Sequence, residues 1–177
     1  MDTYKIACRE CARAGESCCF DPRILPTMDE VDQLTAAGHK DFLTAYVYKG
    51  EGSWADKWDQ AMVVEVDEKN YELCVRRGSE GSCVFLVSGK GCTLGDKRLR
   101  LCKVFPRWVS RGIMLIDSEF PSCRLKKMSM SRILQEINET PQSIIEYCEK
   151  IIEDGLQYKK ERTILVKQLV DAGQITH

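Results

Sequence analysis

A cluster of cysteines near the start of the chain constrains its fold more than any other feature. Cys8 and Cys11 form a Cys-x-x-Cys pair, and the adjacent residues Cys18 and Cys19 follow shortly after. Four sulfurs in so short and polar a segment exceed what core packing requires, and a Cys-x-x-Cys turn can direct two thiolates at one ion. The cluster therefore predicts zinc or iron–sulfur ligands, with a redox-active or disulfide-forming cluster as the alternative.

The length and cysteine content of the chain favour metal binding over structural disulfides. The chain has 177 residues and ten cysteines, so it can bury a core and does not need disulfides to fold. Its first residues lack the basic lead and apolar run of a signal peptide, and no apolar stretch is long enough to span a bilayer. We therefore expect a cytoplasmic protein without a membrane partner, whose thiols stay reduced.

Charge is unevenly distributed along the chain, although the net charge is only −1. Residues 1–70 carry 8 basic and 14 acidic side chains, whereas residues 95–132 carry 10 basic and 3 acidic ones. A basic segment of this kind can attract nucleic acid or an acidic partner, and it can also offset the negative charge of a Cys₄ centre. We favour charge balance and pairing with the acidic N-terminal part over nucleic-acid binding.

Capping residues predict two short helices in the first two thirds of the chain. Thr27 and Glu30 form a capping box, which predicts a helix that begins there and ends at Gly38. Gly95 with Asp96 predicts a second helix that runs through Leu101 and leaves Cys102 at its end. His39 lies just past the first helix, where a polar surface role is favoured over metal binding.

Apolar patterns separated by turn residues predict an antiparallel hairpin that joins residues 61–66 to residues 71–76. Residues 108–116 are predicted to form either a further strand or a second hairpin around Arg111-Gly112. Residues 42–48 are compatible with either a short helix or a strand. Cys74 lies in the middle of a predicted strand, where a cysteine commonly serves as a small buried hydrophobe, so we expect it to pack rather than to bind metal.

The last part of the chain, residues 133–177, is predicted to be a helical extension. Thr140 caps a helix that has Pro141 at its first position, and Gly155 is expected to interrupt it. Cys148 belongs to an apolar stripe and is therefore expected to pack. The stripe is expected to face the core, and it could also dock a protein partner. Its predicted members are Ile144, Ile145, Cys148, Ile151, Ile152 and Leu156, continued by Ile164, Leu165, Leu169 and Val170.

Setting aside the two packing cysteines leaves eight candidate metal ligands. Cys83 and Cys92 adjoin glycine-rich turns, whose backbone N–H groups can stabilise a thiolate. Adjacent cysteines project in different directions, so Cys18 and Cys19 are not expected to bind one ion side by side. Two Cys₄ sites, or one cluster with spare thiols, are both compatible with the count. The candidate ligands are Cys8, Cys11, Cys18, Cys19, Cys83, Cys92, Cys102 and Cys123.

In their order along residues 8–123, these motifs resemble the CxxCxxCC, or YkgJ-like, cysteine-cluster family of zinc- or iron-chelating domains. The chain departs from the family pattern in the longer gap after Cys11, in Leu99 where the family has proline, and in Arg124 after Cys123. The parts that carry the resemblance are Cys8-x-x-Cys11 with Cys18-Cys19, then Cys83-Val84-Phe85-Leu86, and finally Cys92, Arg98 and Cys102-Lys103-Val104-Phe105-Pro106.

The resemblance implies a metal-binding protein with a structural, sensing or electron-transfer role. An iron–sulfur cluster such as [4Fe–4S] is preferred over zinc, although cysteine spacing does not separate the two. The family includes flagellin lysine N-methylases, so a methyltransferase or a subunit of one is an alternative. However, Ser88-Gly89-Lys90-Gly91 lacks the strand that precedes a nucleotide-binding loop. Metal trafficking or thiol redox chemistry is the other alternative.

Together these patterns predict an α+β fold with a small antiparallel sheet, a loop-rich cysteine metal core, flanking helices and a helical C-terminal tail. We expect two parts. Residues 1–132 would form the cysteine-cluster metal-binding domain, and residues 133–177 would form the helical extension packed on it.

Overall fold

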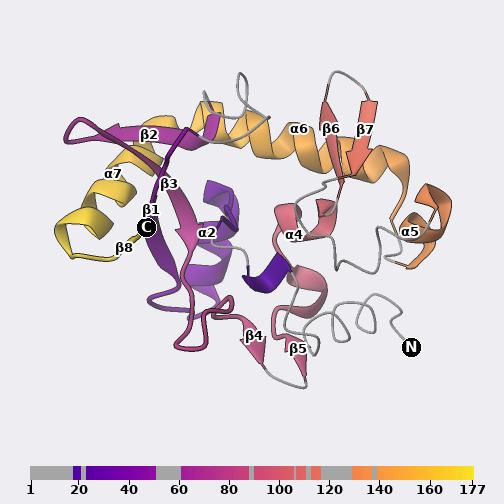
Figure 1. Ribbon diagram of the computed structural model, residues 1–177, viewed down its shortest axis with the longest axis horizontal. Helices are drawn as coiled ribbons and strands as arrows, with labels where there is room; N and C mark the ends of the chain where they lie inside the picture. The colour runs from indigo at the N-terminus through magenta and orange to yellow at the C-terminus, as the bar shows by residue number, and fades with distance from the viewer. Residues whose placement is uncertain are drawn as a thin grey trace.

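The computed structural model has an α+β fold, which confirms the predicted class. Figure 1 shows a sheet at one side of the molecule and a long helix, α6, along the top. Within the described residues, no helix has both the length and the apolar character needed to cross a bilayer. The structure describes residues 18–20, 23–50, 61–87, 90–105, 107–110, 113–116, 129–136 and 139–177.

The main sheet has four strands in the order β2-β3-β1-β8. The predicted hairpin of β2 (Val63–Val66) and β3 (Lys69–Val75) is confirmed, and β3 also pairs antiparallel with β1 (Leu43–Val47). The short strand β8 (Ile175–Thr176) runs parallel to β1, so the sheet is mixed rather than purely antiparallel. The C-terminal segment therefore completes the sheet of the N-terminal part.

Helix α2 (Met28–Ala36) begins where the capping box predicted it. The carboxylate of Glu30 accepts a hydrogen bond of 2.9 Å from the backbone N–H of Thr27, as the motif requires. Val31 and Leu34 of this helix are buried in an apolar cluster that they share with side chains of the sheet. Met28 N–H donates to the carboxylate of Asp154 at 2.8 Å, which ties the start of α2 to the C-terminal helices.

The helix predicted from residue 95 through Leu101 is split in two, so that prediction is wrong. A 3₁₀ turn, η2 (Gly95–Lys97), is followed by an extended Leu99 with ψ of 146° and then by helix α4 (Arg100–Val104). The break is stabilised by a tertiary contact, because the N–H of Arg100 donates to a carboxylate oxygen of Glu30 at 2.6 Å. As a result Cys102 lies in the middle of α4 rather than at the end of a helix.

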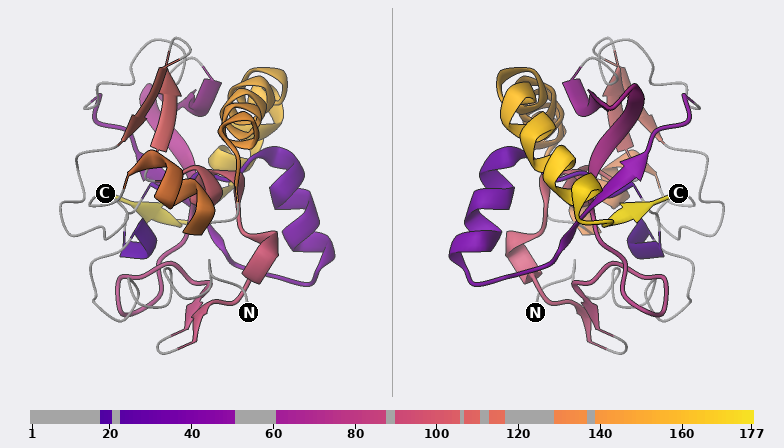
Figure 2. Two further views of the ribbon diagram at one scale, coloured as in Figure 1. Left: turned by 90° about the vertical axis from the view of Figure 1, so that its right-hand side faces the viewer. Right: turned by 90° about the vertical axis from the view of Figure 1, so that its left-hand side faces the viewer.

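Two small hairpins lie outside the main sheet. The hairpin of β6 (Arg107–Ser110) and β7 (Ile113–Ile116) was one of the two predicted alternatives for its segment, and it pairs Trp108 with Leu115. The hairpin of β4 (Leu86–Val87) and β5 (Gly91–Cys92) was not predicted, because two-residue strands carry no periodic signal. Figure 2 shows the β4–β5 hairpin at the opposite end of the molecule from α6.

Three helices follow β7: α5 (Met130–Glu136), α6 (Pro141–Gln157) and α7 (Lys159–Asp171). Thr140 caps α6 as predicted, but α6 continues through Gly155, so the predicted interruption there is wrong. A Cβ atom at Gly155 would lie 2.7 Å from the carbonyl oxygen of Ala61, so this glycine allows a close approach rather than a break.

The predicted apolar stripe of the tail is only partly buried. Ile144, Cys148 and Ile151 face the core, whereas Leu156 is 54% exposed and Ile164 is 51% exposed, which contradicts their predicted burial. Helices α6 and α7 therefore each bury a narrower apolar face than the sequence pattern indicated. Figure 2 shows both α6 and α7 on one side of the molecule.

The buried side chains form two apolar clusters, and the first of them bounds the cysteine site. This cluster combines side chains of α2, the sheet and α7 with Cys83, Phe85 and Leu99. Three further cysteines, Cys19, Cys92 and Cys102, pack against its edge. The second cluster lies between α4, α6 and the far side of the sheet, and it contains Cys74 and Cys148.

Candidate metal centre

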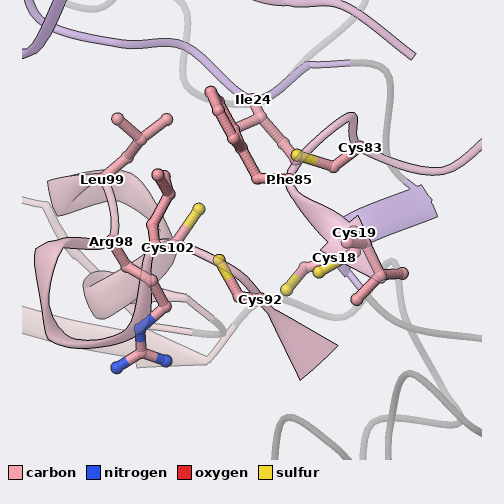
Figure 3. Close-up of a pocket in the computed structure, with 11 residues that line it drawn as sticks. Cys18, Cys19, Ile24, Cys83, Phe85, Cys92, Arg98, Leu99 and Cys102 are labelled. Carbon is pink, nitrogen blue, oxygen red and sulfur yellow. The ribbon is translucent and has the colours of Figure 1, made fainter. Parts of the chain in front are cut away.

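Five of the eight cysteines predicted as ligands line a single pocket. They come from four separate segments and their sulfurs lie around one space (Figure 3). The other three predicted ligands, Cys8, Cys11 and Cys123, lie outside the described residues. The structure thus brings together residues that are more than eighty positions apart in the chain. The five pocket cysteines are Cys18, Cys19, Cys83, Cys92 and Cys102.

Short backbone contacts hold the segments of the pocket in place. The 3₁₀ turn η1 (Cys18–Phe20) is tied to the next segment, because the N–H of Cys83 donates to the carbonyl of Cys19 at 2.6 Å. Arg77 also donates from its guanidinium to the carbonyl of Phe20. Cys92 lies opposite Leu86 in the β4–β5 hairpin, which follows Cys83 closely in the chain. These contacts join three of the four cysteine-bearing segments.

Backbone N–H groups point at two of the pocket sulfurs, and they come from residues that follow each cysteine rather than from the glycine-rich turns that precede it. The N–H of Phe85 donates to the sulfur of Cys83. The N–H groups of Leu94 and Gly95 donate to the sulfur of Cys92. Each donor lies two or three residues after its cysteine, so a tight local turn creates the contact. Such donors stabilise the thiolate form, which is the form that binds metal.

The pocket nevertheless disfavours thiolates as long as no cation balances them. Burial, assisted by the neighbouring Cys19 and Cys92, raises the pKa of Cys83 to about 12. Burial and the same group of sulfurs raise the pKa of Cys102 well above its ordinary value. A thiolate in this pocket is repelled by its neighbours and is poorly solvated, so a bound metal cation would replace the protons that the thiols otherwise keep.

Apolar side chains and one arginine complete the wall of the pocket. Arg98 lies on the side of Cys92 and Cys102 (Figure 3), and its positive charge lowers the pKa of Cys92 against the larger, upward effect of burial. Arg98 is held in place because its Nε donates to the carbonyl of Gly95 at 3.0 Å. The apolar wall consists of Ile24, Phe85, Leu86, Leu94 and Leu99.

The donor set suits a thiolate-bound metal, whereas the side chains are not placed in coordination geometry. Among the described residues, no three Cys, His, Asp or Glu side chains are arranged closely enough to hold one ion. The pocket encloses a cavity of about 30 Å³, which is room for one or two atoms of the size of a water oxygen. Five soft sulfur donors, two of them with N–H support, are chemically suited to zinc or iron.

The basic segment pairs within the molecule where it is described. Arg100 donates to both carboxylate oxygens of Asp29, at 2.7 and 2.8 Å, so this basic residue contacts the acidic N-terminal part as predicted. Lys103 lies over the ring of Tyr147 at 5.4 Å from its centroid. The rings of His39 and Phe85 form a T-shaped pair with centroids 5.2 Å apart, and His39 does not line the pocket.

The two cysteines predicted to pack lie in the second apolar cluster. Cys74 is 0% exposed and Cys148 is 4% exposed, so both are buried as expected. Burial raises the pKa of Cys148 to about 11, although the N–H of Val109 and the charge of Arg107 act in the opposite direction. Its neutral thiol is therefore a packing group in the folded protein at neutral pH.

We expect the unfolding free energy of the wild type to fall more steeply than that of Cys148→Ala as the pH rises from 9 to about 11. The Cys148 thiol ionises near pH 9.0 in the unfolded chain and near 11 in the folded chain, so its contribution is complete below pH 9.0 and is lost as the pH rises through the folded pKa. The difference should reach about 2 kcal/mol in urea unfolding. Parallel pH profiles for the two proteins would contradict this assignment.

Sequence patterns did not indicate two features of the site. Ile24 enters the pocket wall from a segment without periodicity, and only the tertiary fold places it there. Glu30 was assigned to its own helix cap, while its second contact, to Arg100, had no local signal because the two residues are 70 positions apart.

No protein-family model, curated protein or solved structure matches this chain, so the resemblance to the YkgJ-like cysteine-cluster family rests on the motif residues themselves.

Proposed function

We propose that this protein binds a metal through the cysteine pocket, as an iron–sulfur cluster or as zinc. The observation that supports the proposal best is the convergence of five cysteines from four segments, two of which receive backbone N–H hydrogen bonds. The convergence distinguishes these cysteines from Cys148, whose sulfur also receives a backbone N–H, from Val109, but which lies apart in the second apolar cluster. Such donors are useful where sulfur carries negative charge.

The proposed roles follow from the position of each residue. Cys83, Cys92 and Cys102 would each supply one thiolate from a different segment, and one residue of the pair Cys18 and Cys19 would supply the fourth. Adjacent residues project differently, so the second cysteine of the pair would lie beside the centre as a spare thiol. A site assembled in this way would link distant segments and stabilise the fold, by on the order of 10 kcal/mol for a structural zinc.

Arg98 and the apolar wall would set the electrostatic properties of the centre. Four thiolates bring more negative charge than a single divalent ion neutralises, and Arg98 lies where it already favours the charged form of Cys92. The apolar wall, which includes Phe85 and Leu99, limits access of water to the sulfurs. Low solvent exposure is one of the factors that determine the reduction potential of an iron–sulfur cluster.

The size of the cavity bears on the choice of metal. A single zinc ion would need less displacement of the pocket side chains than a cluster of several iron and sulfide ions, because the cavity measures about 30 Å³. The motif resemblance, by contrast, favours an iron–sulfur cluster. Both centres use four thiolates, and both would support a structural role, whereas sensing by redox change or electron transfer would require iron.

Purification without oxygen, followed by elemental analysis and visible absorption spectroscopy, tests the proposal. A brown protein that contains iron and acid-labile sulfide would assign an iron–sulfur cluster. A colourless protein with stoichiometric zinc would assign a zinc site. A folded protein that contains neither metal would overturn the proposal.

A further inference from the structure

Helix α4, which carries Cys102, begins at a contact with the distant helix α2. The chain is extended at Leu99, and α4 starts with Arg100, whose N–H donates to Oε1 of Glu30 at 2.6 Å. Cys102 is the third residue of this five-residue helix. In so short a helix the direction of every side chain depends on where the first turn is fixed. The contact with Glu30 therefore holds the N-terminal end of the helix that carries Cys102.

The carboxylate of Glu30 caps two helices at once. Its Oε2 accepts hydrogen bonds from the N–H of Thr27 at 2.9 Å and from the hydroxyl of Thr27 at 2.8 Å, which caps α2. Its Oε1 accepts a hydrogen bond from the N–H of Arg100, the first residue of α4. Glu30 is only 8% exposed, so little water is available to replace either contact. One buried side chain thus fixes α4 relative to α2.

The side chain of Arg100 adds a second link between the same two helices. Its Nη1 and Nη2 donate to the two carboxylate oxygens of Asp29 at 2.7 and 2.8 Å. Nη1 also donates to the hydroxyl of Thr27 at 2.7 Å. A bidentate contact restricts orientation as well as distance. The start of α4 is therefore held by its backbone and by its first side chain.

We propose that Glu30 is a positioning residue of the metal centre, which holds α4 so that Cys102 faces the other thiols of the pocket. The inference rests on the proposed metal-binding function. Glu30 itself is not a ligand in this arrangement, because both of its oxygens are engaged with N–H and O–H donors. It acts as outer-shell partners of metal sites do, by orienting a ligand.

A positioning role can be distinguished from an effect of charge, because the two predict opposite results. After burial and the neighbouring sulfurs, the negative charge of Glu30 is one of the influences that raise the pKa of Cys102. Removal of that charge would by itself favour the thiolate and strengthen metal binding. Loss of the correct orientation of Cys102 would weaken metal binding.

The substitution Glu30→Gln separates the two contacts of this residue. Glutamine can keep one oxygen on the N–H of Thr27, because glutamine also occurs in capping boxes. Its amide NH₂ group would then face the N–H of Arg100, where two donors cannot form a hydrogen bond. Asp32→Asn is the matched control, since it removes one carboxylate charge from an exposed position of the same helix.

The experiment is an anaerobic titration of the reduced full chain with cobalt(II), whose thiolate charge-transfer absorption reports the sulfurs bound. We expect Glu30→Gln to bind cobalt about 10- to 100-fold more weakly than the wild type and with a changed absorption band. Asp32→Asn should match the wild type. Equal or tighter binding by folded Glu30→Gln would overturn the positioning role. Absence of a thiolate band in the wild type would instead overturn the metal-binding function.

A second measurement does not depend on the folding of any variant. The N–H of Arg100 donates a hydrogen bond to Glu30. If Glu30 couples the start of α4 to the metal centre, cobalt binding to the wild type should slow hydrogen exchange at this N–H. The slowing at Arg100 should exceed the slowing at the N–H of Lys167, which lies in α7 away from Glu30. An unchanged exchange rate at Arg100 after cobalt binding would contradict the coupling.

Discussion

Replacement of Cys102 by serine is expected to abolish metal binding and to unfold much of the protein. Cys102 comes from α4 and faces sulfurs that other segments supply, so its loss would disconnect α4 from the proposed metal centre. A serine hydroxyl is a poor ligand for zinc or iron compared with a thiolate. Because a structural metal contributes on the order of 10 kcal/mol, the variant should show low metal content and reduced circular dichroism.

Cys148→Ala is the matched control for Cys102→Ser. Cys148 is also buried, but it lies in the second apolar cluster, away from the pocket. This variant should retain the full metal content and lose only about 1 kcal/mol of stability, which corresponds to the removal of one small buried group. The same metal loss in both variants would show that the division into ligands and packing residues is wrong.

Cys8→Ser and Cys11→Ser are expected to behave like Cys102→Ser. Both residues lie outside the described residues, so this expectation depends on the Cys-x-x-Cys spacing alone.

Arg162→Met is expected to lower the free energy of unfolding by about 3 to 5 kcal/mol. Arg162 is fully buried, and its Nη2 donates to Oδ2 of Asp154 at 3.0 Å. Asp154 in turn accepts from the N–H of Met28 at the start of α2. Without Arg162, the buried carboxylate of Asp154 would lose its opposite charge, and the junction of α2, α6 and α7 would weaken.

Lys167→Met provides the control for this second prediction, because Lys167 forms an ion pair from the same helix in an exposed position. Its Nζ lies 3.2 Å from Oδ1 of Asp171, and its side chain is 52% exposed. Water and salt screen such a pair, so the variant should unfold at nearly the same urea concentration as the wild type. Equal destabilisation by Arg162→Met and Lys167→Met would contradict the structural role assigned to the buried pair.

Elements with a local signal were predictable from the sequence. The start of α2 followed from Thr27 and Glu30, and the start of α6 followed from Thr140 and Pro141, because a helix cap is formed by residues within one turn. The hairpin of β2 and β3 followed from apolar patterns on both sides of a polar turn.

Features that depend on distant contacts were not predictable. The break before α4 requires Glu30, which lies 70 residues away from Arg100. The continuity of α6 through Gly155 depends on its close contact with Ala61, whereas glycine in isolation predicts an interruption. Strand β8 is too short to show a pattern, and it forms because the chain after α7 pairs with the side of β1 that β3 does not occupy.

The candidate site follows the same division. The glycine-rich turns before Cys83 and Cys92 indicated N–H support for their sulfurs, but the donors are Phe85, Leu94 and Gly95, which follow the two cysteines. The interpretation of the cysteines as ligands also predicted that cysteines from distant segments would converge, and five of them line one pocket. The apolar wall and the role of Glu30 required the three-dimensional structure, since neither has a signal in the sequence around it.

X-ray absorption spectroscopy at the zinc or iron edge, on protein purified without oxygen, tests the central claim most directly. We predict that the bound metal has a first shell of sulfur at about 2.3 Å, with four sulfur neighbours. A first shell dominated by oxygen or nitrogen would show that the cysteine pocket does not hold the metal, and would contradict this account of the protein.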